Sequence, residues 1–387
     1  MNGTTKALIN LIRYEITKEP LPADISAGFS DDALKELYTL STAHDVAHLV
    51  GSALEENNLL PNDSVVNKKF SEAVFAAAYR QEQLNYELKS ICSVFENANI
   101  AFIPLKGAVL RSMYPQAWMR SGCDLDVLVK KEDLERASAE LVGKLSYKQK
   151  EKEMHDVPFI APTGLVVELH YDLIEKDINA QSELPLKDVW ERSHSQTGSS
   201  HYVMDDETFY YYQVAHMAKH FVNGGCGVKA VVDVWVLNHL TGFDRQKRED
   251  LLCNGGLLDF EKAVVKLSEQ WFAGAGGDDL TDYMQDYIIA GGVYGSLENM
   301  VTVQRVKRGG TFRYYMSRIF LPYKFLKFQY PILQKHKWLL PFMEVRRWFR
   351  LLFKRSSKRS SREVQINREM TEEKKKQTET MMKRLGL

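Results

Sequence analysis

The chain has 387 residues, enough for two or three domains, and its 44% hydrophobic and 26% charged residues are those of an ordinary soluble globular protein. No apolar run approaches the roughly 20 residues that a helical membrane span needs. The formal net charge is zero, but the charges are unevenly distributed along the chain.

The N-terminus and the cysteines favour a cytoplasmic protein. Residues 1–6 run into a helical pattern and lack the charged, apolar and cleavage regions of a signal peptide. Cys92, Cys123, Cys226 and Cys253 are scattered without a CxxC pair, which predicts neither a disulfide framework nor a zinc knuckle. We therefore expect a reducing cytoplasm.

The first part of the chain is predicted to be helical. Apolar residues follow helical spacing from Leu8 to Ile16. Ser30, followed by two aspartates, is a typical helix N-cap. From Ser64 to Asn97 neither Gly nor Pro interrupts the pattern, which predicts one long helix that packs against the residues after it.

A short apolar run at residues 99–105 predicts the first strand, and Lys106-Gly107 follows it before a helix opens at Ala108. A strand, a glycine turn and a helix form a phosphate-binding arrangement, because glycine lets the backbone approach a phosphate and the helix start presents N–H groups to it. Lys106 adds a mobile positive charge. Such turns are common, so a solvated turn lysine is the alternative.

Asp124 and Asp126 lie in the apolar run from Cys123 to Val129, which predicts a strand. Side chains at i and i+2 point to the same face of a strand. Two buried carboxylates repel each other unless a cation is bound, and paired oxygen ligands suit Mg²⁺. A salt-bridged or turn-forming pair is the alternative interpretation.

A second β-branched run, residues 164–172, places Glu168 in mid-strand on the same face as His170. A carboxylate among apolar neighbours needs a cation or a hydrogen-bonded partner. Glu168 is therefore the predicted third metal ligand, and an ion pair with Arg120 is the alternative. His170 is expected either beside the metals or as a core histidine.

Two further helices carry polar residues that we expect beside a cleft. His216 and His220 lie on the first, and Lys229 and Asp233, at i and i+4, lie on the second. The histidine spacing fits zinc, but no Glu follows His216 and no third ligand is evident, so packing and hydrogen bonding are the expected roles. Tyr294 is expected in the core rather than stacked on a base.

The C-terminal part of the chain is strongly basic. Residues 305–362 contain 17 Lys or Arg and one acid, Glu344; residues 305–387 carry a net +17, and residues 1–304 carry −17. This asymmetry predicts a polyanionic contact: the acidic body of the same protein, RNA, or an anionic membrane surface. Short helices separated by prolines are expected there, with a frayed, charged helix after Arg362.

Together, these motifs resemble a known family, the uncharacterised nucleotidyltransferases of the polymerase-β superfamily. The residues that carry the resemblance are Lys106-Gly107, Arg120 with Asp124-x-Asp126, Val167-Glu168-Leu169-His170, the run from His216 to Gly225, and Lys229 with Asp233. It extends over about residues 65–355. One departure is the turn, where the superfamily generally has Gly-Ser and this chain has Lys-Gly, as this family tends to have.

The resemblance implies an α+β fold with a small mixed-sheet core between helical N-terminal and C-terminal regions. The expected organisation is a helical N-terminal region at 1–98, a catalytic core at 99–200, a helical domain closing the cleft at 201–304, and a basic, aromatic-rich helical segment with a charged tail at 305–387.

The resemblance also implies a Mg²⁺- or Mn²⁺-dependent reaction, with two ions held by Asp124, Asp126 and Glu168. A hydroxyl of a small molecule, protein or RNA would attack the α-phosphorus of a nucleoside triphosphate and release pyrophosphate. Contacts to the nucleotide or the acceptor would come from Lys106, Gly107, Arg120, His220, Lys229 and Asp233. For Arg120 a purely structural salt bridge is an equal alternative.

Two other functions are compatible with the same residues. A kinase-like phosphotransferase would act at the γ-phosphate and release ADP instead of pyrophosphate. A non-catalytic nucleotide-binding or regulatory protein would bind nucleotide without turnover.

Overall fold

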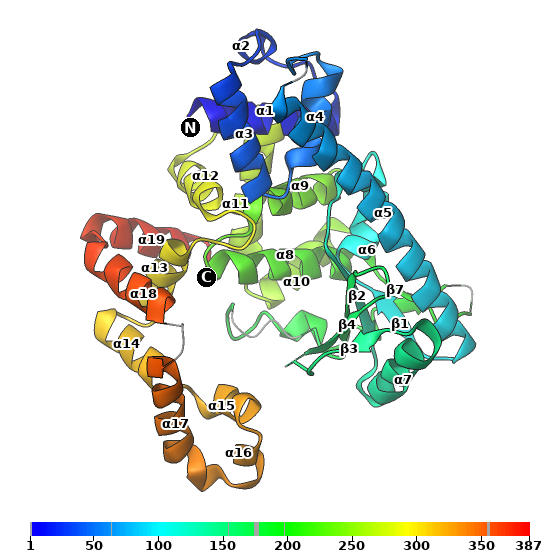
Figure 1. Cartoon of the computed structure of the whole chain (residues 1–387), viewed down its shortest axis with the longest axis vertical. Helices are drawn as coiled ribbons and strands as arrows, with labels where there is room; N and C mark the ends of the chain where they lie inside the picture. Colours follow the sequence, from blue (N-terminus) through cyan, green and yellow to red (C-terminus); the bar gives the residue numbers. More distant parts are fainter. Residues whose placement is uncertain (1, 63, 154, 174–177, 197, 354–356) are drawn as a thin grey trace.

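The structure, a computed structural model, describes residues 2–62, 64–153, 155–173, 178–196, 198–353 and 357–387. Helices predominate, and the strands form one five-stranded mixed sheet and one two-stranded sheet. Figure 1 shows helices at both ends of the chain, with the larger sheet beside the helices of its middle part. The predicted α+β class with helical flanks is confirmed.

The N-terminal region consists of five helices: α1 (Gly3–Thr17), α2 (Ala23–Ser26), α3 (Asp31–Ala43), α4 (Ala47–Glu56) and α5 (Val65–Asn97). The predicted cap at Ser30 is confirmed, because its hydroxyl accepts the backbone N–H of Ala33 at 3.2 Å. The predicted long helix is α5, whose 33 residues extend about 50 Å. Phe70 on its N-terminal half packs in the core of the N-terminal region, whereas Leu84 and Ile91 pack beneath the sheet.

The five-stranded sheet has the order β1-β2-β5-β4-β3, and only the central pair β2–β5 is parallel. The strands are β1 (Phe102–Pro104), β2 (Asp124–Val129), β3 (Lys148–Gln149), β4 (Asp156–Ile160) and β5 (Val166–His170). The sequence predicted β1, β2 and β5. The small second sheet pairs β6 (Ser193–Ser195) with β7 (Tyr202–Met204).

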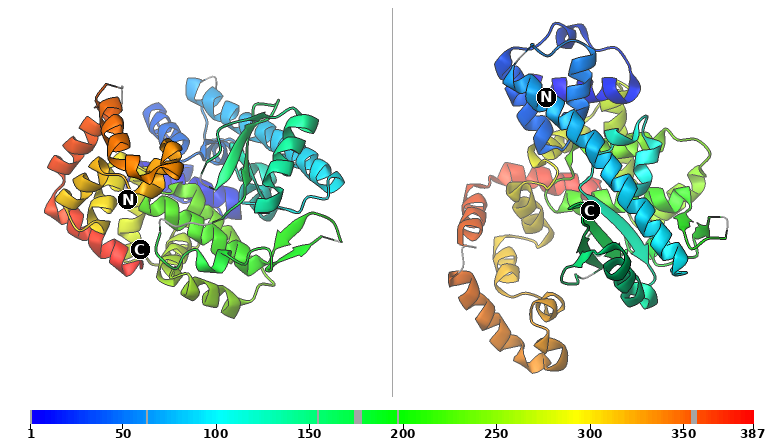
Figure 2. Two further views of the ribbon diagram at one scale, coloured as in Figure 1. Left: turned by 90° about the horizontal axis from the view of Figure 1, so that it is seen from below. Right: turned by 45° about the vertical axis from the view of Figure 1, so that its right-hand side comes forward.

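The two faces of this sheet have different surroundings. Leu125, Val127 and Val167 form a core with α5 and with α7 (Leu134–Leu145), and Figures 1 and 2 show both helices on that side of the sheet. Because strand side chains alternate between faces, Asp124, Asp126, Glu168 and His170 project from the opposite face. This alternation keeps the carboxylates away from the apolar core.

The middle of the chain is a helical layer whose side chains belong to the largest core. Its helices are α8 (Asp206–Val222), α9 (Gly227–Asn238), α10 (Arg245–Asn254), α11 (Leu258–Phe272), α12 (Asp279–Gly291) and α13 (Leu297–Lys307). Two very short helical segments follow β1, namely α6 (Gly107–Leu110) and a 3-10 turn at Arg111–Met113.

Residues 311–353 form a group of helices that we call the C-terminal lobe, at the lower left of Figure 1. It consists of α14 (Thr311–Ile319), α15 (Tyr323–Gln329), α16 (Ile332–Lys335) and α17 (Leu340–Phe353). Pro322 and Pro331 are the N-cap residues of α15 and α16, which agrees with the prediction of short helices separated by prolines. Among the described residues, no helix combines the length and apolarity needed to cross a membrane.

The predicted frayed helix after Arg362 is instead two helices, α18 (Ser357–Glu369) and α19 (Glu372–Arg384). Met381, Met382 and Leu385 are buried in the largest core, and Arg384 pairs with Asp279 at 2.8 Å. The prediction was wrong because three apolar residues near the end of a highly charged segment provide enough buried surface to dock it.

Candidate active site

The sheet face that points away from α5 and α7 brings together His170 and two of the three predicted metal ligands, Asp126 and Glu168. In the parallel β2–β5 register, Asp126 lies opposite Glu168, and Leu128 lies opposite His170. One ligand atom from each of Asp126, Glu168 and His170 lies within 4.8 Å of the others. Asp124 is on the same face, one side-chain position further toward the start of β2, and is outside this group.

Asp126 is the buried centre of this face. Its Oδ1 lies 2.7 Å from Lys106 Nζ and 2.8 Å from His170 Nε2, and it is 2% exposed. Burial opposes ionisation, but the charge of Lys106 and the hydrogen bond from His170 hold the pKa of Asp126 well below its usual range. Both partners use Oδ1, so Oδ2 accepts no hydrogen bond from a described residue.

The other two carboxylates are less buried than Asp126. The Glu168 side chain is 30% exposed and lies 3.5 Å from His170 Nε2. Burial and the nearby charge of Asp126 raise the pKa of Asp124, which is half-buried. Like-charged neighbours on one face are unfavourable unless a cation shields them, so the local electrostatics favour a bound cation.

The Lys106 side chain is held in place by its ion pair with Asp126, whereas the sequence predicted a mobile charge. It has φ 44° and ψ −120°, a conformation that glycine normally adopts at the first central position of a tight turn. The Ala108 N–H donates to the Leu105 carbonyl, which closes the turn, and Leu105 N–H donates to Asp126 O. Backbone strain of about 1–3 kcal/mol is therefore held where the lysine ammonium meets the aspartate.

The structure gives a reason for glycine at position 107 that differs from the predicted one, which was close approach of the backbone to a phosphate. A Cβ atom at Gly107 would lie 3.0 Å from Arg111 Nη2, and one at Gly122 would lie 2.7 Å from the same atom. Both glycines therefore leave room for a guanidinium that packs against the backbone, and the positive φ falls on Lys106 instead.

Arg111 is a site residue that the sequence did not indicate. It is 5% exposed, its Nε is buried without a partner, and it makes no hydrogen bond or ion pair with any described residue. Burial and the nearby Arg120 charge lower the pKa of Arg111 to about 10. An unpaired buried guanidinium is unfavourable, and a bound anion would compensate for its charge.

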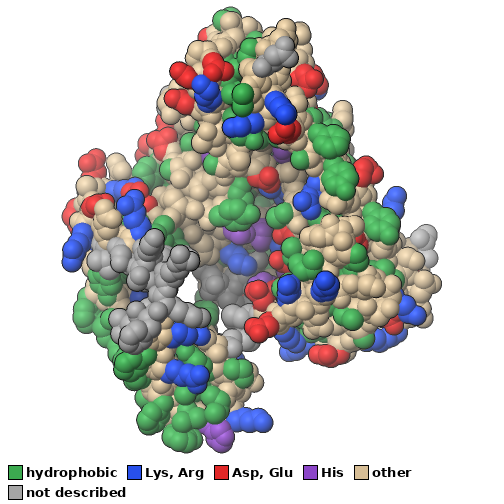
Figure 3. Space-filling model, in the orientation of Figure 1, with side chains coloured by type: hydrophobic (Ala, Val, Ile, Leu, Met, Phe, Trp, Pro, Cys, Tyr) green, Lys and Arg blue, Asp and Glu red, His purple; other side chains and the backbone are tan. Residues whose placement is uncertain are grey.

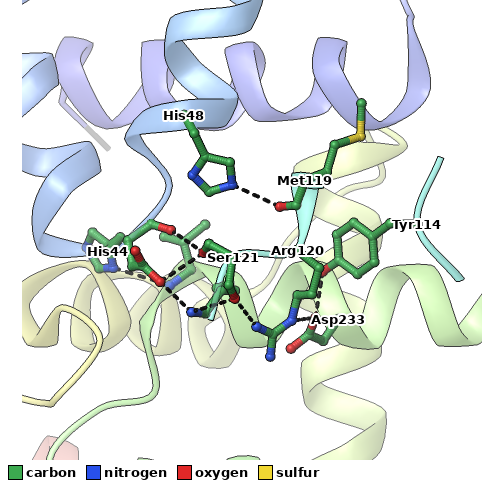
Figure 4. Close-up of polar contacts among 10 residues, drawn as sticks. His44, His48, Tyr114, Met119, Arg120, Ser121 and Asp233 are labelled. Atoms are coloured by element: carbon green, nitrogen blue, oxygen red, sulfur yellow. Dashed lines mark hydrogen bonds and ion pairs between the residues drawn. The ribbon is translucent and has the colours of Figure 1, made fainter. Parts of the chain in front are cut away.

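Arg120 and Asp233 pair with each other, as Figure 4 shows. Arg120 Nε lies 2.6 Å from Asp233 Oδ1, and the Tyr114 hydroxyl donates to the same oxygen at 2.5 Å. Arg120 and Asp233 are largely buried, so this cluster joins the loop before β2 to α9. Arg120 therefore forms a salt bridge, as one of the alternatives predicted, but its partner is Asp233 and not Glu168.

Lys229 reaches the N-terminal region. Its Nζ lies 2.6 Å from Asp45 Oδ2 and 3.3 Å from the Ser121 carbonyl, and the Ser121 hydroxyl also donates to Asp45 at 2.9 Å. Figure 4 shows Ser121 beside His44 and Arg120. Two histidines flank Asp45. His44 Nδ1 accepts the Val228 N–H, and His48 Nε2 lies 3.0 Å from the Met119 carbonyl.

The turn between α3 and α4, together with His48 in the first turn of α4, therefore contacts both the start of α9 and the loop before β2. Burial lowers the pKa of His44 and of His48, which keeps both rings neutral near neutral pH. The sequence carried no signal for these contacts, because their partners are 71 or more residues away.

His216 and His220 lie together on α8, with 3.1 Å between their Nε2 atoms. His220 is exposed and His216 is half-buried. Neither residue belongs to a group of three metal-ligating side chains among the described residues. Figure 3 shows acidic, basic and histidine side chains gathered at a hollow in the middle of this face of the molecule.

Tyr294 is not a core residue, so that expectation was wrong. It is 88% exposed in the turn after α12, where Val293 N–H donates to the Ala43 carbonyl. The nearby charge of Cys123, partial burial and the charges of Asp45 and Asp124 raise the pKa of Tyr294.

The donor set fits a divalent cation that prefers oxygen ligands. Asp126 has one carboxylate oxygen that no described residue contacts by a hydrogen bond, and Glu168 lies opposite it on the parallel strand. Carboxylate oxygens are the usual ligands of Mg²⁺ and Mn²⁺. A second group, His155, Asp156 and His170, shares His170 with the first.

Comparison with known families agrees with the resemblance that the motifs suggested. The model of a family described as uncharacterised nucleotidyltransferase matches residues 30–273, which include every predicted site residue. Comparisons with curated proteins and with solved structures gave no match.

Proposed function

The chain belongs to the family of uncharacterised nucleotidyltransferases, and from this premise we propose that it transfers a nucleoside monophosphate from a nucleoside triphosphate to a hydroxyl group. Family membership supports nucleotidyl transfer in general terms. The observation that carries the finer proposal is the register of β2 and β5, which sets Asp126 opposite Glu168 on the face that also bears Asp124.

In this proposal Asp124, Asp126 and Glu168 hold Mg²⁺ or Mn²⁺. When bound, the metal ions neutralise the triphosphate and make the acceptor hydroxyl easier to deprotonate. The acceptor oxygen forms a bond to the α-phosphorus, the bond from that phosphorus to the bridging oxygen breaks, and pyrophosphate leaves. Glu168, the more exposed of the two opposed carboxylates, takes the hydroxyl proton.

Lys106 and Arg111 supply the positive charge for the triphosphate. Lys106 is already beside Asp126, and the Arg111 guanidinium lies against the backbone at Gly107 and Gly122 without an ion pair to any residue that the structure describes. Arg120, Lys229 and Asp233 support this site by joining its loops to α9 and to the N-terminal region. Tyr294, exposed in the turn after α12, offers a ring on which a base can stack.

The direct test is incubation of the full chain with each α-labelled nucleoside triphosphate, Mg²⁺ or Mn²⁺, and cell extract. We expect label in an acceptor together with released pyrophosphate, and no label transfer by the Asp124→Asn/Asp126→Asn double variant. In a parallel incubation with γ-labelled ATP, transfer of the label with release of ADP would instead establish a kinase. Nucleotide binding without turnover under all these conditions would establish a regulatory protein.

Replacing Arg111 should weaken nucleotide binding without weakening the fold. In Arg111→Met we expect the Kd for a nonhydrolysable triphosphate with Mg²⁺ to rise about tenfold, because a charge-assisted contact to phosphate is lost. The Tm should be unchanged or higher, because an apolar side chain replaces an unpaired buried charge. Calorimetric titration and thermal unfolding measure the two effects.

Arg248 provides a matched control for Arg111. It is also 5% exposed, but it donates to the Leu237 carbonyl and lies over the ring of Phe243. Arg248→Met should therefore lower the Tm and leave the Kd for nucleotide unchanged. If Arg111→Met behaves in the same way as Arg248→Met, Arg111 is a structural residue and does not bind phosphate.

A further inference from the structure

The C-terminal lobe, residues 311–353, presents a surface that is both apolar and basic. We propose that this lobe binds the surface of an anionic phospholipid membrane. Its exposed apolar side chains enter the boundary between headgroups and acyl chains, and its Lys and Arg side chains contact the anionic headgroups.

Exposed apolar side chains are concentrated on two helices of the lobe. On α14 or directly after it they are Phe312, Met316, Ile319 and Phe320, and on α17 or in the 3-10 turn before it they are Trp338, Phe342, Val345 and Phe349. Spacings of three, four or seven residues place Phe312, Met316 and Ile319 along one side of α14, and Phe342, Val345 and Phe349 along one side of α17. Trp338, Phe342 and Phe349 are 68%, 61% and 57% exposed, so no described residue covers them.

The outward side of α17 carries apolar side chains in addition to the charged ones that a surface helix normally exposes. Glu344 and Arg347 are buried and pair at 2.8 Å, while Phe342, Val345 and Phe349 face outward. Surface helices normally bury their apolar side and expose their charged side. An outward apolar side suits a helix that lies against a membrane.

The charges of the lobe complement an anionic surface. Glu344 is the single acid among residues 305–362, and its ion pair with Arg347 is buried, so the lobe exposes no carboxylate of its own. Lys335, Lys337, Arg346 and Arg350 are exposed beside the apolar side chains. In Figure 3 the lower part of the lobe shows hydrophobic side chains together with Lys and Arg.

Membrane binding explains this surface better than RNA binding or pairing of two copies. RNA-binding surfaces use aromatic rings to stack bases, but Ile319, Ile332 and Val345 are aliphatic and cannot stack. Pairing of two copies through this surface would bring like-charged side chains together without an exposed acid to balance them. An anionic membrane satisfies the apolar and the basic side chains at once.

The test is flotation of the full chain with vesicles of phosphatidylcholine alone or mixed with phosphatidylglycerol. We expect binding to the mixed vesicles and little binding to phosphatidylcholine alone. Binding should fall as salt rises from about 0.1 M to about 0.5 M, because exposed charges are then screened. Phe342→Ser/Phe349→Ser and Arg346→Gln/Arg350→Gln should each weaken binding on the order of tenfold.

Matched controls are available elsewhere on the surface. Phe75 and Tyr79 form an exposed stacked pair on α5, and Lys148 and Lys150 are exposed near the edge of the sheet. Phe75→Ser/Tyr79→Ser and Lys148→Gln/Lys150→Gln should leave vesicle binding unchanged. Circular dichroism verifies that all four variants remain folded.

Three results would overturn the proposal. One is the absence of flotation with the mixed vesicles, and another is flotation that the lobe variants and the control variants reduce equally. The third is that flotation is absent while the full chain binds a single-stranded RNA, or forms a dimer in sedimentation, and the lobe variants abolish that binding or that dimer. None of these results bears on nucleotidyl transfer, which is measured separately with labelled nucleotide.

Discussion

Asp124→Asn and Glu168→Gln are expected to abolish nucleotidyl transfer without unfolding the protein, whereas Asp126→Asn is expected to cause both losses. Each of the first two changes removes one oxygen ligand of the metal ions from a partly exposed side chain. We expect kcat/KM to fall about a thousandfold, which corresponds to about 4 kcal/mol of transition-state stabilisation.

Asp126→Asn differs because the carboxylate that it removes also pairs with two buried side chains, Lys106 and His170. Removing its charge leaves the Lys106 ammonium without its partner, and it weakens the hydrogen bond from His170. Loss of one partner of a buried ion pair costs about 3 kcal/mol in the free energy of unfolding. Asp126→Asn should therefore lose activity about a thousandfold and also unfold at a lower denaturant concentration.

Denaturant unfolding and the labelled-nucleotide assay, performed on the same preparations, separate these effects. A Lys106→Met/Asp126→Leu double variant is the control, because it removes both charges of the pair and should recover part of the stability but none of the activity. If Asp124→Asn and Glu168→Gln retain full activity, the three carboxylates are not the metal ligands.

Asp233→Asn is expected to lower stability by about 3 kcal/mol, because it leaves the buried Arg120 guanidinium without a counter-charge and weakens the contact from Tyr114. The Tm should fall by several degrees. Nucleotide affinity of the folded variant should remain near that of the unchanged protein, because Asp233 points into the joint between the loop before β2 and α9.

Two milder variants calibrate this effect. Tyr114→Phe removes a single hydrogen bond and should cost about 1 kcal/mol. Lys229→Met removes a pair whose acid, Asp45, is half exposed, and it should cost at most about 1 kcal/mol. If Asp233→Asn raises the Kd for nucleotide and leaves the Tm unchanged, Asp233 contacts the ligand, as the sequence predicted.

The sequence predicted those parts of the site that depend on local pattern. β2 and β5 follow from alternating apolar residues, and the alternation that defines them also places Asp126 and Glu168 on one face. The cap at Ser30 and the unbroken helix α5 follow from similarly local signals. These features need no knowledge of the tertiary fold.

Pairings across long distances could not be predicted. Arg120 meets Asp233 across 113 residues, and the partner of Lys106 depends on the antiparallel register of β1 with β2. The sequence did not point to Arg111. What distinguishes Arg111 is that it is buried without an ion pair to any described residue, and only the folded structure shows this. Patterns in sequence identify charged residues, but they do not determine which charges are already neutralised.

The length of α5 has a consequence for how this protein can vary. Its two halves belong to different cores, one around Phe70 and the other around Ile91, and no Gly or Pro interrupts the helix between them. Each residue of a helix advances the chain by about 1.5 Å and turns it by about 100°. Inserting or deleting one residue between Phe70 and Leu84 would rotate the sheet and its carboxylates relative to the N-terminal turn in which Asp45 pairs with Lys229. The number of residues in α5 therefore sets the geometry of the candidate active site, even where the exposed side chains of α5 are free to change.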